Sequence, residues 1–109
     1  MEILYRAHFG RTIGKNGYVT DEVLKSFLRD NVSPRFKGFT FIPVNGYWEG
    51  NPESSFILEF ITSADKGPLV QTISEEYCEQ FSQDAVLWYA TEAKNVTFAN
   101  ANAKEMVAA

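Results

Sequence analysis

The spacing of apolar residues constrains the fold of this chain more than any other feature of its sequence. Apolar and polar residues alternate along residues 2–9, and short runs rich in aromatic and β-branched residues follow at 38–44, 55–62 and 84–90. Alternation with a period of two is typical of a strand that has one buried face. The sequence therefore predicts four strands at these positions.

Two further segments have helical spacing. At residues 20–31, Thr20 can cap the first turn, and Pro34 ends the helix because the residue before a proline avoids helical backbone angles. At residues 68–81, Pro68 suits the first helical position, and apolar residues recur every three or four positions. The sequence therefore predicts one helix after the first strand and another after the third.

The predicted order of elements is β-α-β-β-α-β, which places the chain in the α+β class. Right-handed connections in this order give the ferredoxin-like split βαβ sandwich, an antiparallel sheet ordered 4-1-3-2 with two helices on one face. The second strand lies at an edge of that sheet. Pro43 agrees with this, because proline cannot donate to a central ladder. Apolar residues occupy both faces of the first and third strands, so we expect the uncovered face to be buried in an oligomer.

Length, charge and hydropathy narrow the classes of function. The 109 residues predict one domain at 1–98, and an alanine-rich tail at 99–109 is expected to be helical or disordered, with a short strand considered at 95–98. Fourteen acidic and ten basic residues give a net charge of −4, which disfavours a nucleic-acid partner. No apolar run reaches membrane length and the start has no signal-peptide pattern, so we expect a cytoplasmic location and no membrane partner.

The residue types of common catalytic centres are scarce. His8 is the only histidine and Cys78 the only cysteine, which argues against a metal site, a disulfide and a nucleophilic dyad or triad. We expect His8 at the surface or at an interface. We expect Cys78 to be a buried structural thiol, because three acidic neighbours disfavour its thiolate, namely Glu75, Glu76 and Glu79.

Residues 45–56 gather aromatic and acidic side chains around a turn between two predicted strands. Tyr47 and Trp48 are adjacent, and the acids Glu49 and Glu53 follow them. Aromatic faces and carboxylates both attract positive charge, so the segment suits a cationic ligand. The alternative is an aromatic strand end packed on the core, followed by a solvated acidic hairpin. We expect Glu49 to face solvent and Glu53, next to the following strand, to be the active acid.

Two other segments are candidates for lining a binding site. Phe9, Gly10 and Arg11 follow the first strand and could edge a pocket, because a glycine permits close approach of the backbone; a flexible loop is the alternative. Gln83 offers a donor and an acceptor for an adenine edge or an amino-acid head group. The neighbouring Asp84 has capping of a turn as its alternative role.

These segments also resemble a known family. The run Gly46-Tyr47-Trp48-Glu49, the later Glu53 and above all the run Gln83-Asp84-Ala85-Val86-Leu87-Trp88-Tyr89 are similar to the bacteriophage S-adenosylmethionine lyases, formerly called hydrolases. The resemblance covers about residues 3–98. The stretch from Val32 to Thr40 also resembles a bacterial family of unknown function.

The resemblance implies a trimer of ferredoxin-like subunits with active sites between the subunits. It implies cleavage of S-adenosylmethionine to methylthioadenosine and homoserine lactone, in which the substrate's own carboxylate displaces the sulfonium and no cofactor, metal or protein nucleophile is required. Glu53 would then be the key acid, near the sulfonium or the amino group. Tyr47 would position the substrate and Trp48 would stack on it, while Gln83 and Asp84 would bind it across the subunit interface.

Two functions of different classes remain open from the sequence. The first is a phage-encoded lyase that depletes S-adenosylmethionine in the cytoplasm of the host cell and so counters host restriction. The second is a non-catalytic phage protein that binds and sequesters a small nucleotide-like molecule at the same inter-subunit pocket. A structural oligomer without a ligand is a third alternative.

Overall fold

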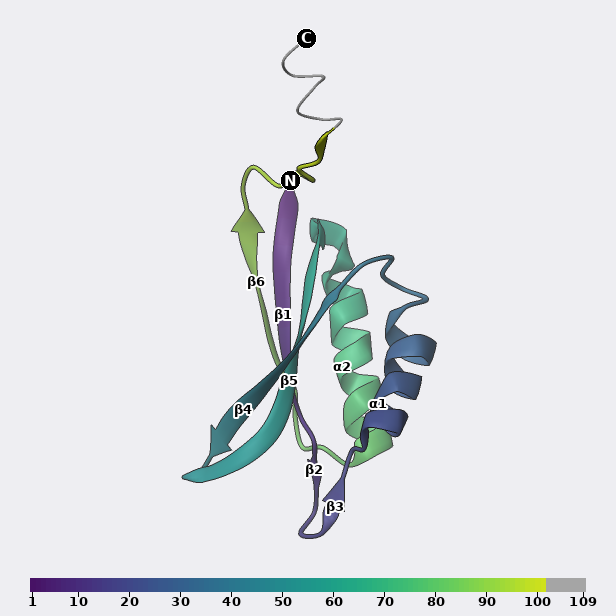
Figure 1. Ribbon diagram of the computed structural model, residues 1–109, viewed down its shortest axis with the longest axis vertical. Helices are drawn as coiled ribbons and strands as arrows, with labels where there is room; N and C mark the ends of the chain where they lie inside the picture. Colours follow the sequence, from purple (N-terminus) through teal and green to yellow (C-terminus); the bar gives the residue numbers. More distant parts are fainter. Residues whose placement is uncertain (102–109) are drawn as a thin grey trace.

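The computed structural model of the chain describes residues 1–101 (Figure 1). Its elements follow one another as β1 (Glu2–Gly10), β2 (Thr12–Ile13), β3 (Gly17–Tyr18), α1 (Asp21–Phe27), the π-helical η1 (Leu28–Val32), β4 (Thr40–Trp48), β5 (Asn51–Ser63), the 3₁₀-helical η2 (Ala64–Lys66), α2 (Gly67–Phe81) and β6 (Leu87–Ala93). The long strands form one antiparallel sheet in the order β4-β5-β1-β6. Counted along the chain this is the 4-1-3-2 order of the ferredoxin-like fold, and Pro43 lies in an edge strand, as predicted.

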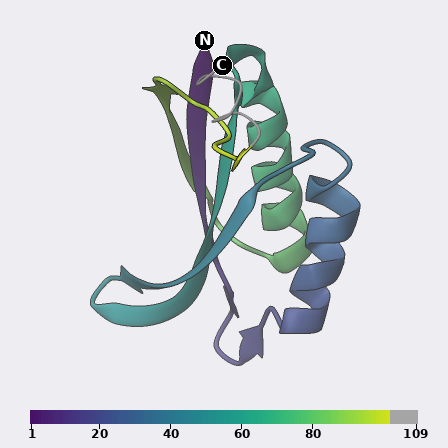
Figure 2. The same cartoon turned by 45° about the horizontal axis from the view of Figure 1, so that its top comes forward.

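Both α-helices cover the same face of the sheet (Figures 1 and 2). Alternate residues of β1 and β5 point toward these helices, and they pair across the two strands as Phe9 with Phe56 and Ala7 with Leu58. The buried apolar side chains therefore form one layer between the sheet and the helices: Tyr5, Ala7, Phe9, Val19, Leu24, Phe27, Val32, Phe36, Phe56, Leu58, Phe60, Val70, Ile73, Tyr77 and Phe81.

An aromatic cluster forms the centre of this core. Tyr77 on α2 is fully buried, and four phenylalanine rings lie with their centroids 4.8–5.7 Å from its own. They come from β1, α1, β5 and the end of α2, namely Phe9, Phe27, Phe56 and Phe81. Much of the high aromatic content is therefore used in packing, where such rings bury large apolar areas in favourable edge-to-face geometry.

The hairpin of β4 and β5 extends beyond the rest of the sheet. Gly10 is the last residue of β1 and pairs with Ser55, so residues 45–54 pair only with one another and form what we call the arm. Figure 2 shows the arm reaching away from the two helices. Its turn consists of Glu49 and Gly50, both with positive φ, as a tight two-residue hairpin of this kind requires.

The predicted strand ends at 44 and 55 were therefore wrong, because the strands run on to residue 48 and start at residue 51. The Asn, Gly and Pro residues of 45–54 indicated a long turn. These residue types are tolerated in the two-stranded ladder of the arm because no third strand pairs with it. Pro52, which has no amide hydrogen, therefore does not need to donate a hydrogen bond to such a strand.

The other boundaries differ less from the prediction. Thr20 caps α1 with its hydroxyl oxygen 3.4 Å from the amide nitrogen of Val23, and the helix continues into η1. The last strand begins at residue 87 rather than 84, and residues 95–98 form no strand. The glycine-rich loop contains the short ladder of β2 and β3. The predicted tail lies mostly outside the described residues, which end at 101.

The face of the sheet away from the α-helices is mixed in character. Arg6 donates a 2.7 Å hydrogen bond from Nε to Glu59, and His8 Nε2 lies 3.3 Å from the Tyr89 hydroxyl. Ile61 and Leu87 are exposed on the same face. Within residues 1–101, no helix has the length and apolar character needed to cross a membrane.

Candidate functional site

The side chain of Glu53 lies over the backbone of Gly10. Both residues belong to the sheet face away from the helices, since Gly10 pairs with Ser55 and Glu53 is two residues from Ser55 on the same strand. A Cβ atom on Gly10 would overlap with Glu53 Oε1 and would stand 3.0 Å from its Cδ. A glycine at position 10 is therefore what allows the carboxylate to rest at the end of β1.

Gln83, just after the end of α2, also reaches the backbone of Gly10. Ser82 ends α2 in the left-handed conformation, with φ of 52°, and this reversal brings the next residue back toward the loop after β1. Gln83 Nε2 donates to the carbonyl oxygens of Thr12 at 2.8 Å and Phe81 at 3.1 Å. These two bonds leave its Oε1 directed to Gly10, 3.3 Å from the position that a Cβ would take.

The two side chains present hydrogen-bond acceptors without a matching donor. Among residues 1–101, no group donates a hydrogen bond to the Glu53 carboxylate or to Gln83 Oε1, and Glu53 forms no ion pair there. Both residues are half-buried. An ionised carboxylate and a carbonyl oxygen that converge in this way are suited to a ligand that carries N–H groups or positive charge.

Tyr77 holds the backbone of this site in place from the core side of the sheet. Its hydroxyl donates a 2.6 Å hydrogen bond to the carbonyl oxygen of Gly10. Burial raises the pKa of Tyr77 and the nearby charge of Glu53 raises it further, while Arg11 acts in the opposite direction. The phenol therefore stays protonated and acts as a fixed donor that holds the end of β1. The sequence does not indicate this role for Tyr77, because its helical spacing is that of a core residue.

Arg11 and Phe9 flank the site but face the core side of the sheet. The Arg11 side chain is 9% exposed, and its Nε and Nη2 donate to the carbonyl oxygen of Val19 at 2.9 and 2.7 Å. Nη2 also pairs with Asp21, which lowers the pKa of that carboxyl. Phe9 is buried and stacks on Phe56 at 4.8 Å. The structure thus gives both residues packing and bonding partners inside the fold.

The β2–β3 ladder is fastened to the base of the arm. The Arg11 guanidinium lies 4.7 Å from the ring centre of Tyr18, whose hydroxyl is 3.3 Å from Ser54 Oγ. The backbone amide of Arg11 donates to the carbonyl oxygen of Ser54 at 3.0 Å. These contacts fix Ser54 next to Glu53, so the carboxylate is carried on an anchored segment. Nothing in the sequence pattern indicated a role for Tyr18 or Ser54.

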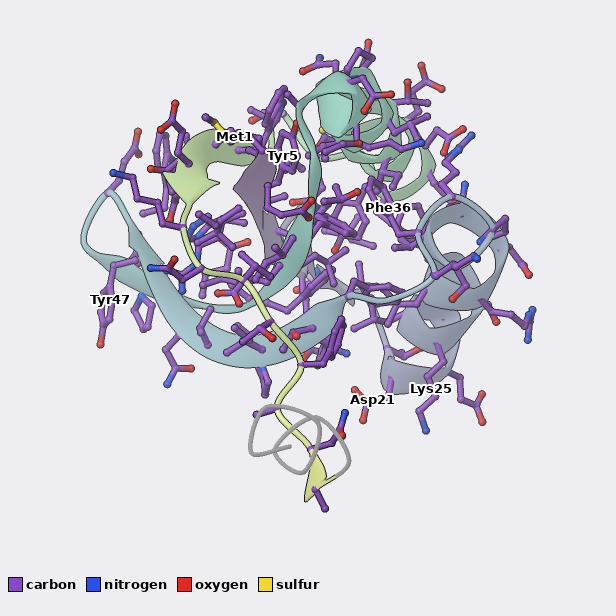
Figure 3. All side chains as sticks on the ribbon, turned by 90° about the horizontal axis from the view of Figure 1, so that it is seen from above. Met1, Tyr5, Asp21, Lys25, Phe36 and Tyr47 are labelled. Atoms are coloured by element: carbon purple, nitrogen blue, oxygen red, sulfur yellow. The ribbon has the colours of Figure 1, made fainter. Side chains whose placement is uncertain are left out.

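The two aromatic residues of the arm lie on opposite faces. Trp48 pairs with Asn51 and Gly46 pairs with Glu53, so Trp48 shares a face with the carboxylate, whereas Tyr47 pairs with Pro52 on the other face. Trp48 is 70% exposed and Tyr47 73%. Figure 3 shows Tyr47 across the molecule from Lys25 on α1. The structure of the chain therefore groups Trp48 with Glu53 and separates Tyr47 from them.

Asp84 lies apart from Gln83, in a hollow between α2 and β6 that also includes Cys78 and Trp88. Burial raises the pKa of the Cys78 thiol, and Asp84, Glu75 and Glu79 raise it further. The third predicted neighbour, Glu76, instead pairs with Arg35. Across residues 1–101, no three His, Cys, Asp or Glu side chains are grouped to hold a metal ion.

Sequence comparison places the chain in a family. The model of the family described as "Protein of unknown function (DUF3574)" matches residues 5–98. The chain belongs to this family. No curated protein sequence matches this DUF3574 member.

Solved structures share the fold of the DUF3574 chain. A phage SAM lyase in complex with S-methyl-5'-thioadenosine has a TM-score of 0.67 at 20% identity, with 84% of this chain and 81% of the other covered. A DUF3240 family protein from Shewanella baltica has a TM-score of 0.65 at 9% identity, with coverage of 91% and 97%. A phage SAM lyase in the apo state gives 0.56 at 18%, covering 87% and 92%. At these identities the likeness shows a common fold.

Proposed function

We propose that this protein is an S-adenosylmethionine lyase that forms methylthioadenosine and homoserine lactone at the site around Glu53. The observation that carries the proposal is the convergence of two acceptors, Glu53 and Gln83 Oε1, on Gly10. S-Adenosylmethionine is doubly cationic in its amino-acid part, since it bears an ammonium and a sulfonium. The fold shared with a phage SAM lyase supports the same substrate.

The proposed reaction is intramolecular and needs no reacting group from the protein. One oxygen of the substrate carboxylate attacks the carbon next to the sulfonium, so that a C–O bond forms while the C–S bond breaks. The sulfur leaves with the bonding pair as the neutral thioether of methylthioadenosine, and the other product is the five-membered lactone. No proton is transferred and no water is consumed. The main task of the site is to hold the flexible chain in the conformer that cyclises.

The residues divide this task as follows. The negative charge of Glu53 attracts the cationic part of the substrate, and Gln83 and Gly10 shape the space next to it. Trp48 offers an exposed ring on the same face of the arm, suited to stacking on adenine. His8 and Cys78 have no role in this chemistry.

A homotrimer with sites between its subunits is part of the proposal. Tyr47 and Asp84 lie away from Glu53 in their own subunit, so they would contribute only to the site of a neighbour. The exposed apolar residues Ile61 and Leu87 on the outer sheet face support burial of that face in an assembly. Sedimentation equilibrium measures this directly, and a monomer at micromolar concentration would contradict the shared site.

The decisive experiment is chromatography of S-adenosylmethionine after incubation with the purified protein. We expect methylthioadenosine and homoserine lactone to appear in equal amounts. Glu53→Gln should abolish turnover, whereas Glu49→Gln, a matched change at the exposed turn of the same arm, should not. Undiminished substrate at high protein concentration would exclude the lyase. If the enzyme is phage-encoded, its activity would remove the methyl donor on which host restriction depends.

A further inference from the structure

We infer that the Glu53–Gln83 pair binds the α-ammonium group of the substrate, and that the sulfonium lies elsewhere in the site. This inference rests on the proposed function, because it takes the ligand to be a nucleoside with an amino-acid tail. The ligand carries two positive groups, the ammonium and the sulfonium, and the charge of a single carboxylate would attract both equally well.

The chemistry of the two acceptors favours the ammonium. A sulfonium is surrounded by three carbon atoms and has no hydrogen to donate, so it gains from the charge of Glu53 but little from a neutral carbonyl oxygen. An ammonium has three N–H groups and bonds to both kinds of acceptor. Gln83 uses both of its amide hydrogens on Thr12 and Phe81, which fixes Oε1 as the atom presented to the ligand.

The geometry is that of a small, directed site. Glu53 Oε1 and Gln83 Oε1 both lie within 3.3 Å of one point above the Cα atom of Gly10. The two oxygens are therefore close to each other. Hydrogen bonds from a cationic nitrogen to oxygen are about 2.7–2.9 Å long, so one nitrogen that lies between the two oxygens and clear of the Gly10 backbone can reach both after small side-chain shifts. The hydrogen bond from Tyr77 holds the floor of this site in place.

This placement also directs the reacting carboxylate. The ammonium and the carboxylate are attached to the same carbon, and an acceptor-only site repels the carboxylate while it binds the ammonium. The carboxylate therefore points away from Glu53, where it is free to turn toward the carbon that it attacks. Anchoring one substituent of the α-carbon in this way reduces the number of conformers of the chain and favours the cyclising one.

The test measures binding rather than turnover. Calorimetric titration would compare S-adenosylhomocysteine, which keeps the ammonium and lacks the reactive sulfonium, with its analogue in which hydrogen replaces the amino group. We expect the deaminated analogue to bind about 10- to 100-fold more weakly to the wild-type protein, the usual range for a lost charged hydrogen bond. In Glu53→Gln that ratio should fall toward one, while Glu49→Gln should keep it.

The outcomes separate the two proposals. Equal binding of both ligands to the wild-type protein, or an unchanged ratio in Glu53→Gln, would overturn the ammonium assignment even if the protein cleaves S-adenosylmethionine. Amine-dependent binding without any cleavage would support the assignment and exclude the lyase. Thermal melting of each variant verifies that a lost ratio does not come from unfolding.

Discussion

The hydroxyl of Tyr77 donates a 2.6 Å hydrogen bond to the carbonyl oxygen of Gly10 and so joins α2 to the end of β1. Four phenylalanine rings around Tyr77 fix the position of its phenol. The bond therefore transmits the rigidity of the core to the one glycine over which Glu53 rests.

Tyr77→Phe should separate this positioning role from packing, because it keeps the ring and removes only the hydroxyl. We expect a loss of about 1 kcal/mol in the free energy of unfolding and a lower rate of S-adenosylmethionine cleavage. Tyr5→Phe is the matched control, since the Tyr5 hydroxyl donates to Ser63 and Ala64 at the other end of β1. It should cost similar stability without lowering turnover. Equal turnover in both variants would contradict a special role for Tyr77.

Gly10→Ala should leave the fold intact and disable the site. The added Cβ would overlap with the Glu53 carboxylate, which can swing away because it is the end of a flexible side chain. We expect little change in melting temperature but a loss of S-adenosylhomocysteine binding in calorimetric titration. Gly38→Ala, where a Cβ meets nothing within 4 Å, is the control and should bind as the wild type does. Normal binding by Gly10→Ala would show that the carboxylate need not rest there.

Arg11→Lys tests the anchor of the β2–β3 ladder. A lysine cannot reproduce the two bonds from Nε and Nη2 to the carbonyl of Val19 together with the pair to Asp21. We expect a loss of about 2 kcal/mol in urea denaturation, the cost of a buried carbonyl left without its charged donor. Arg29→Lys, whose partner Asp30 is an exposed neighbour, should leave the midpoint unchanged. A wild-type midpoint for Arg11→Lys would contradict the anchor.

His8 should give the folded state a measurable pH dependence. Burial lowers the pKa of His8, and the charge of Arg6 lowers it further. The unfolded chain therefore takes up the proton more readily, and the stability that neutral His8 contributes is complete above its unfolded pKa of about 6.5 and is lost as the pH falls through the lower folded value. Urea midpoints between pH 8 and pH 5 measure this. His8→Gln should flatten the profile, and an unaltered profile would contradict the assignment.

A mixing experiment tests whether Tyr47 acts on a neighbouring subunit. Tyr47→Ala and Glu53→Gln should each be inactive alone, because every site then lacks one of the two residues. Trimers reassembled from equal amounts of both should regain activity in about one quarter of their sites, since each site needs an intact residue from each of two subunits. Absence of any recovery after verified subunit exchange would mean that Tyr47 and Glu53 of one site come from the same subunit. Full activity of Tyr47→Ala alone would remove Tyr47 from the mechanism.

The topology could be predicted because each of its signals is local. Alternation, helical spacing and the position of Pro43 each depend on a few neighbouring residues, and together they define the strand order. The strand boundaries were harder to predict. The Asn, Gly and Pro residues of the segment 45–54 indicate a long turn, although only Glu49 and Gly50 form it.

The site could be predicted only in part, because some of its contacts join residues that are far apart in the sequence. The sequence favours Glu53 because it lies beside a strand, and Gly10 because a glycine permits close approach of the backbone. The structure brings these two together with Gln83. The support from Tyr77 depends on a contact 67 residues apart in the sequence, for which spacing carries no signal. Gln83 and Asp84 are adjacent in the sequence, but Gln83 approaches Gly10, whereas Asp84 lines the hollow between α2 and β6.

The arm gives this fold a part whose length is free to change. In the strand ladder, residues 45–54 pair only with one another, so adding one residue to each strand at the tip would alter neither the central sheet nor the bonds of Ser54 to Arg11 and Tyr18. Such insertions leave Trp48 and Glu53 on one face, whereas a single residue inserted between Gly46 and Trp48 would turn Trp48 to the other face. The reach of this hairpin can therefore change by whole pairs of residues, with the hydrophobic core left as it is.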